Sequence, residues 1–366
     1  MAYGYRLGKC FEMQLRKPCQ KFWEKKTVAI TGNQGFKGSW LCKLLDALGT
    51  ITFGFGHDDR ADLLYHELDF SNHHFAEGNI NDLLSLRGWL IDTKPDIVIH
   101  MAAQPLVLES YSDPLKTFKD NVIGSANLLE AARGINSIKT IIMVTSDKVY
   151  RNDNKGICFT EECALGGKDP YSASKAAAEI IINSMCECFF DPKSVKVQTV
   201  RAGNVIGGGD WAKDRLLPDL AKSYISQNDV IIRSPDAIRP WQHVLDPLVG
   251  YLLLCEDACN NKVTKHQAWN FGPDAGSKLS VRDVISIFNE SIESNFNIIQ
   301  THPKQNFKEQ LLLSIDSSKS KKILNWQAKW TSEVAVKRTA EWYKNFFDNQ
   351  SANYLVEIEI KDYLSY

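Results

Sequence analysis

The fold is decided by the stretch Lys26-Thr27-Val28-Ala29-Ile30-Thr31-Gly32-Asn33-Gln34-Gly35-Phe36-Lys37-Gly38. Its first six residues form a short apolar, β-branched run that predicts a buried strand, and the apolar positions of residues 39–48 recur at helical spacing. Three glycines in the spacing G-x-x-G-x-x-G lie between them. Glycines allow a tight turn, and the helix N-terminus presents unpaired N–H groups to a pyrophosphate. A glycine triplet alone also fits a structural turn, but the flanking strand and helix favour a dinucleotide-binding site.

Strands and helices alternate outward from this stretch. Further buried strands are predicted at residues 51–56, 95–101, 140–144 and 195–201. Helices are predicted to open at Gly78-Asn79-Ile80 and to cover residues 121–132. This alternation predicts an α/β protein with a Rossmann-type doubly wound parallel sheet, whose ligands bind at the carboxyl ends of the strands.

The chain divides into three parts. We assign residues 22–203 to the NAD-binding Rossmann domain and residues 1–21 to a poorly ordered extension. Three consecutive glycines at 207–209 mark the change to residues 204–366, a smaller α/β substrate-binding region with some chain crossing back to the sheet. In this region we expect helix caps at Ser280 and at residues 316–319, and an edge strand over the alternating residues 354–360.

The second strand ends in acidic residues that suit a dinucleotide. Asp58 and Asp59 follow it about twenty residues after the last glycine, where an acid would bond the ribose hydroxyls of NAD. Arg60 could instead accept a 2′-phosphate, and two adjacent acids are also common in a solvated turn. At the next strand end, Ala102 and Ala103 would let a flat cofactor lie close to the backbone.

Five side chains form the candidate catalytic site. Ser146, Asp147 and Lys148 follow a predicted strand, and Tyr171 and Lys175 lie one turn apart on a predicted helix. A tyrosine with its ordinary pKa near 10 is a poor base at neutral pH, but a nearby ammonium favours the phenolate, which can take a proton from a sugar hydroxyl. Tyr-x-x-x-Lys alone is common on exposed helices. The glycine motif and Ser146 at a strand end favour catalysis here.

Residues after the fifth predicted strand, at 195–201, are candidate substrate ligands together with Gln104, which follows the third. Arg239 offers a guanidinium for a phosphate, whereas Trp241 fits either an aromatic binding surface or core packing. The full candidate set for substrate binding is Gln104, Asn204, Gly209, Asp210, Trp211, Arg215 and Arg239.

Composition excludes several other functions. With 43 Lys and Arg against 44 Asp and Glu the net charge is −1, so no basic surface for nucleic acid or an anionic membrane is expected. The nine cysteines are scattered and lack zinc spacing, which favours reduced thiols, no metal site and a cytoplasmic location. No segment reaches the ~18 apolar residues of a membrane span. The first twenty residues lack the apolar core of a secretory signal, and Glu12 and the absence of serine disfavour a mitochondrial transit peptide.

Several motifs resemble a known family. The glycine turn, the Ser146 strand end and the Tyr171/Lys175 pair resemble the extended short-chain dehydrogenase/reductase superfamily, in its sugar-nucleotide branch. Within that branch the chain closely resembles the CDP-glucose 4,6-dehydratase group, from about residue 22 to residue 342. The resemblance is carried by Thr-Gly-x-x-Gly-Phe-Lys-Gly-Ser-Trp at 31–40, Ala-Ala-Gln-Pro-Leu-Val at 102–107, Thr-Ser-Asp-Lys at 145–148, Arg-Ala-Gly-Asn-Val-Ile-Gly-Gly-Gly-Asp-Trp at 201–211 and Arg-Pro-Trp-Gln-His-Val at 239–244.

The resemblance implies a three-step reaction on CDP-glucose that yields CDP-4-keto-6-deoxyglucose for deoxysugar and polysaccharide synthesis. A tightly bound NAD, regenerated in each turnover, takes a hydride from C4 while Tyr171 acts as base, Lys175 lowers its pKa and Ser146 bonds the same oxygen. Water is then eliminated across C5 and C6 with Asp147 as acid and Lys148 as base, and the hydride returns to C6. Lys148 stands where related dehydratases have Glu, so it must be neutral when it acts; alternatively, it only pairs with Asp147.

The resemblance also implies a set of cofactor-binding residues and an assembly. The cofactor set is Gly32, Gln34, Gly35, Phe36, Gly38, Asp58, Asn79, Ile80, Ala102, Ala103, Gln104, Asn121, Tyr171 and Lys175. The chain departs from the family at Asn33-Gln34, where His-Thr is usual, at Asn79, where Asp is usual, and at Val149, where Cys is common. Relatives associate through two long helices, here those starting near Asn121 and Ser172, so a homodimer or homotetramer is expected.

Two alternatives keep the fold and change the function. One is a 4-epimerase or a 4,6-dehydratase of another nucleotide sugar, and the pair Asp147-Lys148 disfavours plain epimerisation. The other is a catalytically silent NAD(H)-binding sensor or scaffold, which the intact set of five catalytic residues disfavours.

Overall fold

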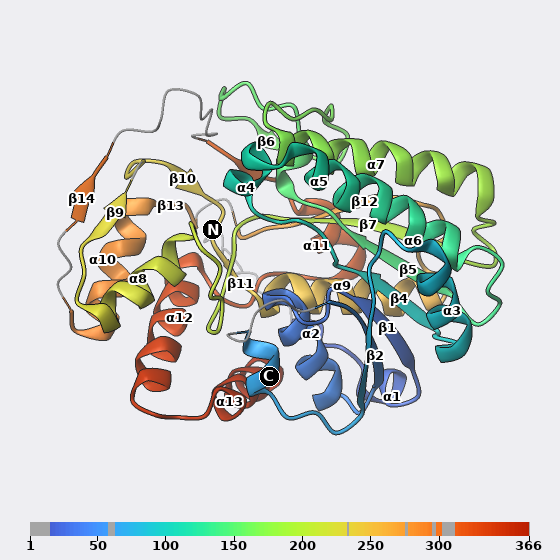
Figure 1. Cartoon of the computed structure of the whole chain (residues 1–366), viewed down its shortest axis with the longest axis horizontal. Coiled ribbons are helices and arrows are strands. Elements are labelled where there is room, and N and C mark those ends of the chain that lie inside the picture. Colours follow the sequence, from blue (N-terminus) through green and yellow to red (C-terminus); the bar gives the residue numbers. More distant parts are fainter. Residues whose placement is uncertain are drawn as a thin grey trace, which may run out of the picture.

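A central sheet of seven parallel strands organises the chain (Figure 1). The computed structural model describes residues 15–57, 63–232, 234–274, 277–294, 298–301 and 312–365. The chain moves outward from β1 in one direction to β2 and β3, and in the other to β4, β5, β7 and β12. The prediction of a doubly wound parallel sheet is therefore confirmed. In sheet order the strands are β12 (Ala268–Phe271), β7 (Lys196–Ala202), β5 (Thr140–Val144), β4 (Ile97–His100), β1 (Thr27–Thr31), β2 (Ile51–Gly56) and β3 (His73–Glu77).

Helices cover both faces of the sheet (Figure 1). Alternate residues of β1 point to opposite faces, so Ile30 joins the core that contains Trp40, while Ala29 joins the core that contains Leu128. The Ala29 face is covered by α3 (Leu83–Thr93), α5 (Pro114–Phe118), the π-helical turn η2 (Lys119–Ile123), α6 (Gly124–Ala132) and α7 (Pro170–Phe189), with α4 (Val107–Ser112) beside α7. The Ile30 face is covered by α2 (Phe36–Ala47), α9 (Leu245–Cys259) and α11 (Ser318–Leu324).

The glycine turn between β1 and α2 requires its glycines. Gly32 has a positive φ of 72°, and a Cβ there would lie 2.7 Å from backbone atoms of Ala102. A Cβ on Gly38 would lie 2.2 Å from the carbonyl oxygen of Gly32. Larger residues would therefore push α2 away from the strand that it follows.

Part of the chain after β7 forms a smaller region beside the sheet (Figure 1). Trp40 of α2 donates a hydrogen bond from Nε1 to the carbonyl oxygen of Gly208 at 3.0 Å, which ties this region to the glycine turn. Other parts return to the main sheet, which α9 and α11 cover and to which β12 adds an edge strand. The remaining elements are η1 (Leu64–Glu67), η3 (Asp147–Val149), β6 (Cys158–Phe159), β8 (Val205–Ile206), α8 (Leu216–Ser226), β9 (Val230–Ile232), β10 (Ile238–Arg239), β11 (Gln242–His243), β13 (Leu279–Ser280), α10 (Val281–Ile292), β14 (Ile298–Gln300), β15 (Ser314–Ile315), α12 (Ser332–Phe347) and α13 (Ala352–Leu364).

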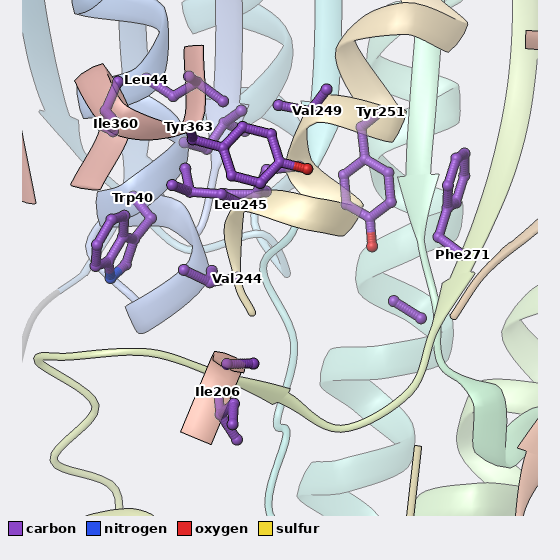
Figure 2. Close-up of a cluster of buried hydrophobic side chains, with 14 of the residues drawn as sticks. Trp40, Leu44, Ile206, Val244, Leu245, Val249, Tyr251, Phe271, Ile360 and Tyr363 are labelled. Carbon is purple, nitrogen blue, oxygen red and sulfur yellow. The ribbon is translucent and has the colours of Figure 1, made fainter. Parts of the chain in front are cut away.

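The predicted C-terminal edge strand is wrong, because residues 354–360 lie inside the helix α13. Over that window apolar and charged residues alternate, but the buried positions of the whole segment, 352, 355, 356, 360 and 363, have helical spacing. Figure 2 shows Ile360 and Tyr363 packed beside Leu44 of α2 and Leu245 of α9. The window used for the strand prediction was too short to reveal the longer period.

The predicted extension is also partly wrong. Residues 1–14 lie outside the described residues, but residues 15–21 pack on α9 and lead into α1 (Gln20–Trp23). The Arg16 guanidinium pairs with Glu256 at 3.0 Å and with Asp257 at 2.8 Å, and the Cys19 N–H donates to Glu256 at 2.6 Å. The acids that anchor this segment are about 240 residues away in sequence, so local patterns carry no sign of the contact.

Two helix boundaries differ from the predictions. The helix predicted to open at residues 78–80 begins at Leu83, because the Asp82 side chain caps it by accepting from the N–H groups of Leu84 and Ser85. The helix predicted over residues 121–132 is preceded by α5 and the turn η2. The predicted cap at Ser280 is confirmed, with Asp283 completing a capping box.

The described residues have three further features, which concern their helices, acidic and metal-ligating side chains, and thiols. None of the helices there is long and apolar enough to cross a membrane. The same residues contain no cluster of three or more histidine, cysteine or acidic side chains that could hold a metal ion. All eight cysteines in this part of the chain have free thiols.

The glycine at 208 provides a test of the packing between the two regions. A Cβ there would lie 1.9 Å from the buried Trp342 ring, so Gly208→Ala should lower the free energy of unfolding by about 1–3 kcal/mol. The control Gly88→Ala, in the middle of α3 with nothing within 4 Å of its Cβ, should raise it by about 0.5–1 kcal/mol. Urea unfolding would measure both, and an unchanged midpoint for Gly208→Ala would show that the Trp342 contact is not tight.

Candidate functional site

The five predicted catalytic residues meet at the carboxyl end of β5. Ser146, Asp147 and Lys148 follow this strand in and beside the turn η3, while Tyr171 and Lys175 lie in the first turns of α7. The Ser146 hydroxyl lies close enough to the Tyr171 phenol to lower its pKa. The Lys148 Nζ lies 5.9 Å from the centre of the Tyr171 ring. Residues about 25 positions apart in sequence thus form one site.

The start of α7 is set by local chemistry. Asp169 caps the helix by accepting the Ser172 N–H at 2.9 Å and the Ser172 hydroxyl at 2.6 Å, and Pro170 occupies the first helical position. The Tyr171 N–H, which has no partner inside the helix, donates to the Ser110 hydroxyl at 3.2 Å. These contacts fix the rotation of α7 and therefore the direction of Tyr171.

Asp147 is a buried carboxyl that is poised to carry a proton. It is only 2% exposed; its Oδ1 accepts from the Ser146 hydroxyl at 3.2 Å, and its Oδ2 has no hydrogen-bond partner within the described part of the chain. Burial raises its pKa to about 6, against the opposing effects of Lys148, Ser146, Arg239 and Lys37. A carboxyl with this pKa is partly protonated near neutral pH and can donate to a ligand.

Burial also moves Tyr171 and Lys175 toward their neutral forms. It raises the pKa of Tyr171 to about 12, although the Ser146 hydrogen bond and the charge of Arg215 act in the opposite direction. It lowers the pKa of Lys175 to about 7; the charge of Lys37 lowers it further, and that of Glu179 raises it. Without a ligand the tyrosine is therefore a phenol, and Lys175 titrates near neutral pH.

Lys37 is a site residue that the sequence analysis missed. It lies in the first turn of α2, and burial, with the charge of Arg215, lowers its pKa to about 8 while Asp147 opposes the shift. Its charge acts on both Asp147 and Lys175, so it faces the same space. The available signal was a lysine placed between Phe36 and Gly38, in a motif otherwise formed by glycine and apolar residues.

The glycine turn fits a dinucleotide. Gly35 is the N-cap of α2 and offers no side chain, so the N–H groups of the first turn remain available for an anion. Phe36 follows it at the start of the helix. The Gln34 Oε1 is buried and finds no partner in the described segments, which leaves an acceptor for a bound ligand. Asp58, predicted to bind the ribose, lies outside the described residues.

The two predicted cofactor residues before α3 differ in role. Asn79 is exposed, and its Oδ1 accepts the Asn81 N–H at 2.9 Å. Ile80 is buried against α6, where a Cβ on Gly124 would lie 2.5 Å from its Cδ1. Ile80 thus contributes packing at the cofactor side of the sheet, whereas Asn79 faces solvent.

Gln104 and Asn121 hold the loop after β4 against α7. The Asn121 amide donates to the Gln104 carbonyl at 3.1 Å and to the Ser174 hydroxyl at 2.8 Å, and its oxygen accepts the Gln104 N–H at 2.8 Å. The Gln104 side chain donates to Thr117 at 2.8 Å. Both side chains are buried and bonded within the protein. They position Ala102 and Ala103, which are half-buried at the strand end.

Two arginines approach the catalytic residues from the smaller region. The charge of Arg215 acts on Tyr171, and that of Arg239 acts on Asp147. Asp210, itself 5% exposed, pairs with Arg215 at 2.7 Å and so directs that guanidinium. Arg239 also donates to the Ile238 carbonyl at 3.1 Å.

The other predicted substrate residues make contacts that involve none of the five catalytic residues. Trp211 packs in an aromatic cluster, 5.3 Å from the ring of Tyr343 between centroids. The Asn204 carbonyl accepts the Gln242 N–H at 3.0 Å, and Gly209 has a positive φ of 76° beside Leu64. Trp241 is a core residue, 6% exposed, whose Nε1 donates to the Leu279 carbonyl at 3.2 Å.

Comparisons with known proteins agree with this arrangement. The family model described as GDP-mannose 4,6 dehydratase matches residues 29–339. The chain is 37% identical over 359 residues to a CDP-glucose 4,6-dehydratase of Salmonella typhimurium, covering 94% of this chain and 98% of that protein. It is 24% identical to a UDP-glucose 4-epimerase of Mycoplasma genitalium, covering 89% of this chain and 98% of that one.

Two solved structures share the fold. The dTDP-glucose 4,6-dehydratase of Streptomyces venezuelae, solved with NAD bound, superposes with a TM-score of 0.76 at 20% identity, covering 87% of this chain and 97% of that one. A UDP-glucose 4-epimerase of Thermotoga maritima, solved with UDP-glucose, gives a TM-score of 0.77 at 21% identity, covering 88% and 99%. Identities this low establish the architecture, and the chemistry must be argued from the side chains.

Proposed function

The chain belongs to the GDP-mannose 4,6 dehydratase family, and from this premise we propose that it is an NAD-dependent CDP-glucose 4,6-dehydratase. This hydro-lyase converts CDP-glucose to CDP-4-keto-6-deoxyglucose. One observation carries the proposal: a Ser146–Tyr171 pair suited to oxidation shares a single buried site with Asp147 and Lys148, which are suited to elimination. The 37% identity to a CDP-glucose 4,6-dehydratase, which extends over 94% of this chain, supports the choice of substrate.

NAD, when bound, supplies a hydride acceptor at C4 and returns the hydride to C6. On this chain the residues proposed to hold it are the glycine turn at 32–38, with its uncapped helix N-terminus, and the unpaired acceptor of Gln34. The alanines at 102–103 leave room beside the strand end. Gln104 and Asn121 act indirectly in this proposal, by holding that loop in place.

Tyr171 removes the proton from the 4-hydroxyl. Its raised pKa means that the phenol cannot do this unaided, so the step depends on positive charge near the phenolate oxygen. Arg215 already acts on Tyr171 in this sense, and Lys175 adds a second cation when it is protonated. Ser146, which also lowers the pKa of Tyr171, is proposed to bond the same substrate oxygen.

Asp147 and Lys148 perform the elimination. Oxidation at C4 acidifies the C5 proton, which a neutral Lys148 takes, while Asp147 donates a proton to the departing 6-hydroxyl. The pKa of about 6 at Asp147 keeps part of its population protonated at neutral pH. The positive charges of Lys37 and Arg239 act on the same carboxyl and oppose the rise in its pKa.

The fold and the remaining surfaces complete the proposal. Free thiols fit a reducing compartment, and we place the enzyme in the cytoplasm. For the assembly we propose a homodimer or homotetramer formed through the helices at η2, α6 and α7. Leu115, Ile123 and Ile180 on neighbouring helices of this layer are 80%, 49% and 61% exposed, which is apolar surface that a second subunit would cover.

The substrate assignment can be tested with a panel of nucleotide sugars. The purified protein with NAD should convert CDP-glucose to a 4-ketosugar, detected by its ultraviolet absorbance in alkali, and should act far more slowly on dTDP-, UDP- and GDP-linked hexoses. A product formed from only one of those other nucleotide sugars would show that CDP-glucose is not the substrate. A 4-epimer without loss of water would replace the dehydratase by an epimerase.

The role of Lys148 can be isolated with Lys148→Met. The variant should still bind NAD and oxidise C4, seen as the absorbance of reduced cofactor, but it should lose product formation by about 100-fold or more because the C5 proton has no acceptor. It should also incorporate no solvent deuterium at C5. Lys155→Met, at an exposed lysine nearby in sequence, is the control. Normal turnover by Lys148→Met would remove this residue from the mechanism.

The assembly can be tested by light scattering after size-exclusion chromatography. The protein should elute as a dimer or tetramer, and Ile180→Glu should shift it toward a smaller species because a buried carboxylate opposes association. Ile225→Glu, at a residue 56% exposed on α8, should leave the assembly unchanged. A monomeric wild-type protein would refute the proposed interface.

A further inference from the structure

A buried ion pair lies directly behind the catalytic residues. Glu179 is on α7, one helical turn after Lys175, and Arg201 is near the end of β7. Their side chains are 5% and 4% exposed; the Arg201 Nε donates to the Glu179 Oε1 at 2.7 Å, and its Nη2 donates to the second carboxylate oxygen. The pair is bidentate, which is the geometry that best offsets the cost of burying two charges.

The ion pair also contacts Thr145, the residue immediately before Ser146. The Thr145 hydroxyl donates to the Glu179 Oε1 at 2.6 Å, and the Thr145 N–H donates to the Val200 carbonyl, next to Arg201, at 2.9 Å. Ser146 begins the turn that carries Asp147 and Lys148. The direction of these side chains therefore depends on where Glu179 holds Thr145.

The same ion pair contacts Tyr150, at the other end of the turn. The Arg201 Nη1 donates to the Tyr150 hydroxyl at 2.8 Å, and its guanidinium lies 4.8 Å from the centre of the Tyr150 ring. Tyr150 in turn donates to the Asn270 side chain of β12 at 2.6 Å. The segment from Thr145 to Tyr150 is thus held at both ends, and its two anchors meet in one ion pair.

Glu179 has a second effect, on the charge of Lys175. Burial and the neighbouring Lys37 both lower the pKa of Lys175, and the Glu179 carboxylate is the group that raises it. Lys175 and Glu179 are at positions i and i+4 of α7, so their side chains lie on the same side of the helix. One carboxylate thus acts on the turn that carries Asp147 and Lys148 and on the lysine that accompanies Tyr171.

We propose that Glu179, paired with Arg201, is a positioning residue that couples the oxidation half of the site to the elimination half. It holds the 145–150 turn in place through Thr145 and Arg201, and it favours the protonated form of Lys175, one helical turn away on α7. Stability alone does not explain the pair, because a buried ion pair is often no more stabilising than apolar residues of the same volume. The activity readouts of this inference rest on the proposed function.

The charge and the anchor can be separated by two variants. Glu179→Gln keeps an oxygen for Thr145 but removes the charge, so the titration of Lys175 should move down by about one pH unit, and the alkaline limb of the kcat profile should move with it. Thr145→Val keeps the charge but loses the hydroxyl, so kcat should fall about 10-fold with KM and the alkaline limb unchanged. Glu130→Gln, in the exposed pair with Arg133, is the matched control and should change neither.

The Lys175 titration can be measured without turnover. Competitive labelling of the whole protein with acetic anhydride across a pH series, read by mass spectrometry, gives the midpoint of each lysine. A Lys175 midpoint that does not move in Glu179→Gln overturns the inference, whatever the activity. Unchanged kcat in Thr145→Val also overturns it and provides the test if Glu179→Gln does not fold. A wild-type protein inactive on every nucleotide sugar refutes the proposed function alone, because the labelling result is independent of it.

Discussion

Burial of charge at the carboxyl end of the sheet is the constraint on which the site depends. Removing an ionised group from water costs several kcal/mol, and the group responds by shifting its pKa toward the neutral form. Asp147, Tyr171 and Lys175 all shift in this direction, to about 6, 12 and 7. In the proposed reaction this helps the elimination, which needs a protonated acid and a neutral base. It hinders the oxidation, which needs a tyrosine that can lose its proton.

The proposed reaction therefore needs Lys175 in its charged form and Lys148 in its neutral form. Glu179 lies beside Lys175 and supports its charge, whereas the carboxyl of Asp147 has Lys37, Lys148 and Arg239 around it and is itself partly protonated. Each half of the site thus has its own acid, Glu179 near Lys175 and Asp147 near Lys148. This arrangement follows from which strand end or helix turn carries each acid, and in the proposed reaction Lys148 and Lys175 have different tasks.

Much of this arrangement could be predicted from the sequence, because it is local. The strand, glycine turn and helix at residues 26–48 have short-range patterns, and the cap at Asp169 and the i, i+4 spacing of Tyr171 and Lys175 are set within one helix. What escaped prediction depends on contacts between distant residues. Lys37 becomes a site residue only when the first turn of α2 lies near Asp147, which follows β5. Arg16 is anchored by acids on α9, and α13 shows its helical period only over its whole length.

The motifs predicted to bind the cofactor and those predicted to bind the substrate are also in contact with one another. Trp40 ends the motif that begins with the glycine turn, and its indole N–H donates to the carbonyl of Gly208 in the triple-glycine loop. On the other side of that loop Gly208 packs against Trp342, and the Asp210 carbonyl accepts the Tyr343 hydroxyl at 2.6 Å. Because Asp210 also holds Arg215, the guanidinium that faces Tyr171 is located by contacts that start at the cofactor turn. The glycines at 207–209 thus serve close packing between α2 and α12. These glycines are explained by the close contact that joins the substrate side of the protein to the cofactor side. Close approach of their backbone to a ligand is not needed to explain them.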